Sequence, residues 1–101
     1  MLTCIIRYHI DPAGTADFHD YARLWQQAIP RCGARLHGYF APHEGSATRA
    51  YGIYDIENLA AYEAYRARLR DDPAGREAFA LAASRRFILR EDRTWLMRAG
   101  A

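Results

Sequence analysis

The first residues of the chain alternate in a way that predicts a β-strand. The segment Leu2–Ile10 is rich in β-branched and aromatic residues, and no Gly or Pro interrupts it before Asp11-Pro12. Its even-numbered positions are all apolar, whereas its odd-numbered positions combine Ile5 with polar residues such as Arg7 and His9. Because neither face is wholly polar, we expect a sheet that is covered on both faces.

Three later segments carry apolar residues at steps of three and four, which predicts amphipathic helices. They are residues 15–29, 59–69 and 73–84. Thr15 is the candidate N-cap of the first helix, and Pro30 and Gly33 end it. Asn58 and Asp72 are the candidate N-caps of the second and third helices, and Pro73 suits a first helical turn.

Between and after these helices, alternating segments predict three more strands, at residues 34–43, 48–56 and 87–97. In the first of them, strict alternation places Leu36 and Phe40 on one side and His37 and Tyr39 on the other. The first two form a hairpin with a loop of about five residues, and Gly52 indicates a bulge or a close approach of another backbone. In the last strand, the predicted apolar face consists of Phe87, Leu89, Trp95 and Met97.

The predicted order is β-α-β-β-α(α)-β, which is the ferredoxin-like α+β arrangement of an antiparallel sheet with helices on one face. No linker, repeat or low-complexity tract divides the chain, so residues 1–101 are expected to form a single domain. The other sheet face would be uncovered in a monomer. We therefore expect two copies to pair through it as a homodimer, a dimeric α+β barrel.

Composition narrows the possible functions. All 14 basic residues are Arg, which excludes Schiff-base lysine chemistry, a P-loop lysine and a lysine-rich nucleic-acid arm. With 12 acidic residues against them, the net charge is only +2, so no nucleic-acid partner is expected. No long apolar run or signal peptide is visible, and Cys4 and Cys32 lack CxxC spacing. We expect a cytoplasmic protein with reduced thiols and no membrane partner.

The sequence contains no strong catalytic motif, and its notable polar residues are histidines and tyrosines of the predicted sheet. His9, His37, Tyr39 and Tyr51, together with His43 and nearby arginines, are expected to share one sheet face. Such a cluster can bind a ligand, ligate a metal or haem, or supply a base near neutral pH, or its members can simply hydrogen-bond at a dimer interface. Trp25, with Phe18, Tyr21, Tyr62 and Tyr65, forms either part of the core or the wall of an apolar pocket.

Three short motifs in a characteristic order extend over most of the chain. They are Ile6-Arg7-Tyr8, His37-Gly38-Tyr39-Phe40, and Ala61–Arg66 followed by Asp72-Pro73. In this the chain resembles small bacterial members of the NIPSNAP family. The resemblance implies a dimeric α+β barrel similar to the antibiotic-biosynthesis monooxygenases, but it implies no settled activity.

Two functions remain open from the sequence. The first is a homodimeric module that binds an apolar or aromatic small molecule between helices and sheet. The second is a cofactor-independent monooxygenase or isomerase, in which a pocket Trp or Tyr and a histidine base handle an aromatic substrate. No cofactor and no metal are expected for either. The candidate pocket residues are Tyr8, His9, Trp25, His37, Tyr39 and Tyr51.

Overall fold

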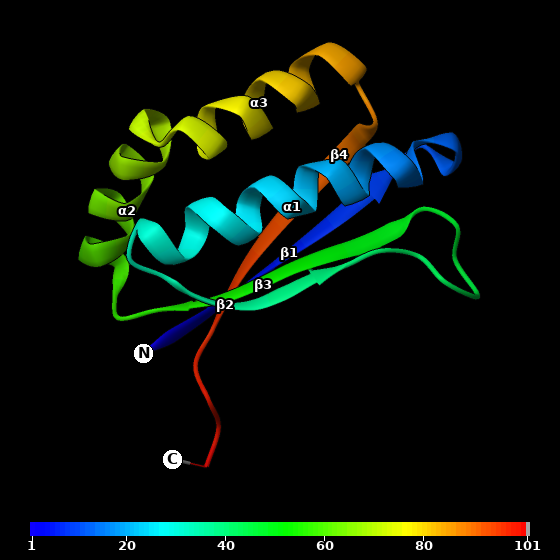
Figure 1. Ribbon diagram of the computed structural model, residues 1–101. Coiled ribbons are helices and arrows are strands. Elements are labelled where there is room, and N and C mark those ends of the chain that lie inside the picture. The colour runs from blue at the N-terminus through cyan, green and yellow to red at the C-terminus, as the bar shows by residue number, and fades with distance from the viewer. Residues whose placement is uncertain (101) are drawn as a thin grey trace.

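A computed structural model describes residues 1–100, which form a four-stranded antiparallel sheet with three α-helices on one side (Figure 1). The elements are β1 (Leu2–Ile10), a 3₁₀ turn (Pro12–Gly14), α1 (Thr15–Arg31), β2 (Arg35–Phe40), β3 (Arg49–Ile56), α2 (Leu59–Asp71), α3 (Pro73–Arg85) and β4 (Ile88–Leu96). The strand order is β2-β3-β1-β4, with all neighbours antiparallel. The predicted ferredoxin-like α+β fold is confirmed.

The two faces of β1 have the character that its alternation predicted. The side chains of Cys4, Ile6, Tyr8 and Ile10 are buried beneath the helices. The odd-numbered positions face away from the helices, and there Ile5 lies directly opposite Ile53 of β3. We call this second face, which no helix covers within residues 1–100, the open face.

Strand β2 departs from the predicted alternation because it contains a β-bulge. Leu36 pairs with Tyr54, but the next pairing is Gly38 with Ile53, so His37 is the extra residue. The bulge reverses the facing of every later position. Tyr39 therefore joins Leu36 on the helix side, and Phe40 lies on the open face, where it is 50% exposed. The prediction that Phe40 and Leu36 share one face of the strand was wrong for this reason.

A second bulge lies between β1 and β4, and because of it the helix-facing residues of the last strand differ from the predicted ones. The register shifts after His9, so Ile88 pairs with Ile10 and Leu89 is left exposed. Met97 lies beyond the strand and is also exposed. The helix-facing residues of β4 are Ile88, Glu91, Arg93 and Trp95, which lie opposite the buried positions of β1.

Two of the three predicted helix caps are confirmed. The Asn58 carboxamide accepts a hydrogen bond from the Ala61 amide at 2.8 Å, and the Asp72 carboxylate accepts from Ala74 and Gly75. Thr15 does not cap α1, because the 3₁₀ turn that precedes it already has helical backbone geometry and Gly14 stands at the cap.

The remaining expectations about the chain concern its thiols and its helices. Cys4 and Cys32 are free and buried, as predicted for reduced thiols. Among residues 1–100, no helix combines the length and apolar character needed to span a bilayer.

Candidate functional site

A cavity of about 610 Å³ lies between the sheet and the helices. Its walls come from β1, β3 and β4 below and from all three helices above, and β2 contributes one residue. Eight of the lining side chains are aromatic: Tyr8, Tyr21, Trp25, Tyr39, Tyr54, Tyr62, Tyr65 and Phe79. A space of this size and lining is typical of small-molecule sites.

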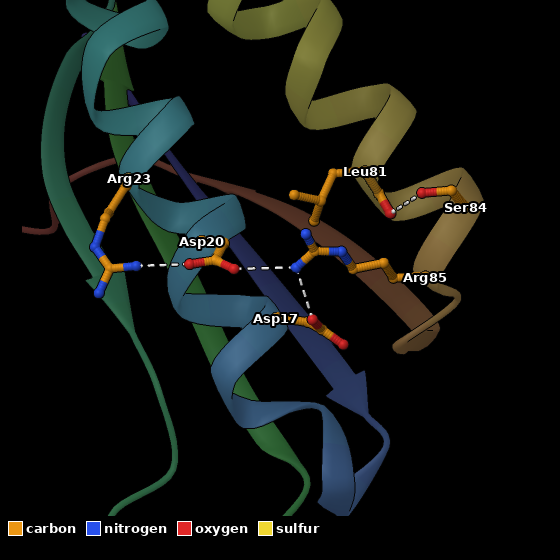
Figure 2. Close-up of polar contacts among 6 residues, drawn as sticks. All are labelled: Asp17, Asp20, Arg23, Leu81, Ser84 and Arg85. Carbon is orange, nitrogen blue, oxygen red and sulfur yellow. Dashed lines mark hydrogen bonds and ion pairs between the residues drawn. The ribbon is translucent and has the colours of Figure 1, made fainter.

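The cavity exists because α3 is held by α1 rather than by the sheet. Figure 2 shows the Arg85 guanidinium of α3 donating to the carboxylates of Asp17 and Asp20 on α1, at 2.8 and 3.0 Å. At its other end α3 is capped by Asp72, whose carboxylate accepts two hydrogen bonds from Arg31 at the end of α1. With both ends tied to α1, α3 does not settle onto β4, and the space between them stays open.

Three tyrosine hydroxyls meet at one end of the cavity. The Tyr8 hydroxyl lies 3.5 Å from that of Tyr21 and 3.4 Å from that of Tyr39. Burial, followed by the neighbouring phenols, raises the pKa of Tyr8 and of Tyr39 well above the ordinary value. The hydroxyls therefore stay protonated at neutral pH and can donate hydrogen bonds. Gly52 makes this possible, since a Cβ there would lie 2.8 Å from the Tyr39 ring.

Trp25 forms the wall beside these tyrosines. Its indole is 4% exposed and packs edge-to-face with Tyr21 and with Phe79, at centroid distances of 5.8 and 5.0 Å. The indole Nε1 is buried, and beyond a weak interaction with the Tyr21 hydroxyl it has no well-aligned hydrogen-bond partner among residues 1–100. A buried donor without a well-aligned partner is costly, so an acceptor atom on a bound molecule would relieve it.

Charged groups also reach the cavity. On β4 the Arg93 guanidinium donates to the Glu91 carboxylate at 3.2 Å, and the two side chains are 39% and 37% exposed. From α2, Arg66 and Arg70 line the same space. Arg66 lies over the Tyr62 ring and is within 3.8 Å of Glu63. Glu91 is the only carboxylate among the lining residues, against three guanidinium groups.

The structure divides the predicted pocket residues between the two faces of the sheet. Tyr8, Trp25 and Tyr39 line the cavity, whereas His9, His37 and Tyr51 do not. His9 and Tyr51 occupy odd positions of their strands and so face away from the helices. The prediction that Tyr39 shares a face with the histidines was wrong, because the bulge at His37 reverses the alternation.

His37 is engaged elsewhere, on the open face. Its Nε2 lies 2.9 Å from Asp55 Oδ2, and Asp55 Oδ1 accepts a hydrogen bond from the Thr3 hydroxyl at 2.7 Å. Although partial burial opposes ionisation, the bonds from Thr3 and His37 lower the pKa of Asp55. The expected cluster of histidines and tyrosines is thus not a single site. Within residues 1–100, no three His, Cys, Asp or Glu side chains are grouped to hold a metal ion.

Sequence reasoning missed the polar part of the cavity, which is formed by Glu91 and Arg93. The sequence could have placed them there, because Glu91 and Arg93 alternate with Trp95 along the strand and Trp95 was predicted to lie on the apolar face. A charged pair on the helix-facing side of a strand departs from the apolar pattern of that face, and such departures are candidates for a functional role.

Comparison with known proteins agrees with this architecture. The NIPSNAP family model matches residues 3–100. Comparison with curated proteins finds no significant match.

Three solved structures show the same fold at low sequence identity. A protein from Agrobacterium tumefaciens has a TM-score of 0.83 and 19% identity, covering 99% of this chain and 95% of that one. An uncharacterized NIPSNAP domain protein from Burkholderia xenovorans has a TM-score of 0.75 and 18% identity, covering 99% and 96%. A putative antibiotic biosynthesis monooxygenase from Nitrosomonas europaea has a TM-score of 0.74 and 12% identity, covering 98% and 99%. At these identities the likeness concerns the fold alone.

Proposed function

Because the chain belongs to the NIPSNAP family and this membership alone assigns no activity, we propose a function from the cavity itself. The proposed function is that of a homodimeric module that binds an aromatic small molecule. The observation that carries the proposal is the cavity of about 610 Å³ with eight aromatic walls. The space is partly open to the surface, and concave, largely aromatic spaces of this size are where proteins bind small molecules. Aromatic walls favour a planar, apolar ligand.

Calorimetric titration with 2-naphthamide, a neutral bicyclic probe, tests this proposal. We expect saturable binding of one probe per chain in the wild type. Ala82→Trp fills the cavity from α3 and is expected to abolish binding, while Ala80→Trp places the same side chain on the exposed side of that helix and retains it. No binding to the wild type, or equal binding to both variants, would overturn the proposal.

A second candidate function is a cofactor-independent monooxygenase or isomerase. The fold likeness to the putative monooxygenase from Nitrosomonas europaea and the donor hydroxyls of Tyr8, Tyr21 and Tyr39 favour it. Its expected histidine base is not supported, since no histidine among residues 1–100 lines the cavity and Glu91 is the one carboxylate there. Oxygen uptake with an anthrone as test substrate, abolished in Glu91→Gln, is the result this candidate requires.

The homodimer is proposed to form through the open face. Apolar side chains there are continuous across three strands, because Ile5 lies opposite Ile53 and Phe40 opposite Tyr51. Exposed apolar patches of this kind mark interaction surfaces. A second copy of the chain is the proposed partner, because a two-fold dimer packs the same patch of both copies together and covers both.

Light scattering checks the oligomeric state at micromolar concentration. We expect twice the chain mass of 11.6 kDa for the wild type. Ile53→Asp is expected to give a folded monomer, whereas Leu59→Asp, which replaces an exposed apolar residue on α2, leaves the dimer intact. A wild-type mass of one chain would refute the pairing.

A cytoplasmic location is also proposed, because Cys4 and Cys32 are both free thiols.

A further inference from the structure

The charges around the cavity are unbalanced, and this restricts the ligand. Three guanidinium groups line it, those of Arg66, Arg70 and Arg93, against the single carboxylate of Glu91. Two of the three come from α2 and one from β4, so positive charge stands on opposite walls of one space. All three residues are partly exposed to solvent, so salt screens their attraction for an anion, and the attraction comes from the three charges acting together.

Arg93 is the guanidinium best placed to meet a ligand. It rises from the middle of β4, opposite Ile6 of the sheet floor; it lines the cavity, and its side chain is 39% exposed. Its one hydrogen bond to a carboxylate joins Nη2 to Glu91 Oε1 at 3.2 Å. Since a guanidinium carries five N–H donors, Arg93 keeps donors that are free to hydrogen-bond to a carboxylate of a bound molecule.

The remaining polar groups of the cavity are also donors. The Tyr8, Tyr21 and Tyr39 hydroxyls remain protonated, and the Trp25 Nε1 has no well-aligned partner among residues 1–100. The tyrosine hydroxyls partly satisfy one another, but a neutral hydrocarbon would offer no acceptor to the remaining donors and would partly desolvate Arg93, which costs free energy. A ligand with acceptor oxygens avoids both costs.

We infer that the cavity is specific for aromatic anions, with the anionic oxygen group bound by Arg93 and the ring held among the aromatic walls. This rests on the proposed function, because it names the class of molecule that the same cavity takes. Glu91 then acts as the internal competitor for Arg93, holding the guanidinium in position until a ligand carboxylate replaces or joins it.

Paired probes test the inference. Calorimetric titrations compare 2-naphthoate with 2-naphthamide, which have the same ring system and differ in charge. For the wild type at low salt we expect 2-naphthoate to bind about tenfold more tightly, with the advantage shrinking as salt is added. Arg93→Gln is expected to lose that advantage while 2-naphthamide affinity changes less than about twofold. Arg90→Gln, on the same strand but outside the cavity, is the matched control.

Glu91→Gln separates ligand recognition from a merely structural ion pair. If Arg93 recognises the anion, removal of the competing carboxylate increases 2-naphthoate affinity. If the ion pair only stabilises the fold, Arg93→Gln and Glu91→Gln both weaken the binding of 2-naphthoate and of 2-naphthamide to the same extent. That result overturns the inference. Equal affinity of the wild type for the two probes overturns the inference but leaves the aromatic pocket standing. Binding of neither probe removes the proposed function as well.

Discussion

Asp72 is expected to be the most important single carboxylate for the stability of this fold. It accepts hydrogen bonds from Arg31 Nε and Nη2, both at 2.9 Å, and it caps α3 through the amides of Ala74 and Gly75 at 2.9 and 3.1 Å. Its side chain is 8% exposed. One carboxylate therefore joins the end of α1 to the start of α3, the helix whose position keeps the cavity open.

The contribution of Asp72 to the free energy of unfolding can be calculated from the pKa of its carboxyl group. The bonds from Arg31, and then those from the backbone amides, outweigh burial and lower the pKa of Asp72 from 3.8 to about 2. Each pKa unit corresponds to about 1.4 kcal/mol, so the full shift would be worth about 2.4 kcal/mol at neutral pH. Arg31 is 52% exposed and solvent screens the pair, which reduces our expectation for Asp72→Asn to about 1 to 2 kcal/mol. Asp72→Ala also removes the cap and should cost about 1 kcal/mol more.

Urea denaturation at fixed protein concentration measures these differences. Because the folded pKa lies below the unfolded one, the stabilisation is complete above about pH 4 and is lost as the pH falls toward 2. The gap between the wild type and Asp72→Asn should therefore shrink to roughly half at pH 3. Arg23→Met, which removes an exposed pair with Asp20, is the control and should cost at most about 0.5 kcal/mol. Equal stability of wild type and Asp72→Asn at pH 7 would refute the reasoning.

Three further substitutions test the packing around the cavity. Trp25→Ala removes a buried indole that contacts Tyr21 and Phe79 and should cost about 3 to 5 kcal/mol by thermal or urea unfolding; unchanged melting would show that the side chain is not core. Gly52→Ala places a methyl 2.8 Å from the Tyr39 ring and should destabilise by about 1 to 3 kcal/mol and weaken 2-naphthamide binding, and normal affinity would contradict the close packing. Asn58→Ala removes the cap of α2 and should cost about 1 kcal/mol without changing probe affinity, a result that calorimetry checks.

Local patterns were sufficient for the elements and for their order. Periods of two and 3.6 residues located every strand and helix, and the caps Asn58 and Asp72 were visible because capping depends on only a few neighbouring residues. The uncovered sheet face followed from the predicted order, since the ferredoxin-like arrangement places its helices on one side of an antiparallel sheet.

The composition of the site was much less predictable. Tyr8 and Trp25 were identified correctly as inward-facing, because they lie on regular stretches of β1 and α1. Tyr39 was assigned to the wrong face and His37 to a pocket it does not line, since one inserted residue in β2 reverses the alternation that follows it.

The sequence by itself thus determined the elements, the α+β class and the aromatic content available to a pocket. Only the tertiary structure decided which side chains meet there, through the two bulges and through the attachment of α3 to α1. The physical reason is that periodicity is a property of neighbouring residues, whereas a bulge is a mismatch between two strands distant in sequence. Tyr39 enters the cavity through such a mismatch, whereas Arg93 and Trp25 reach it from regular stretches that only the packing of α3 on α1 brings around one space.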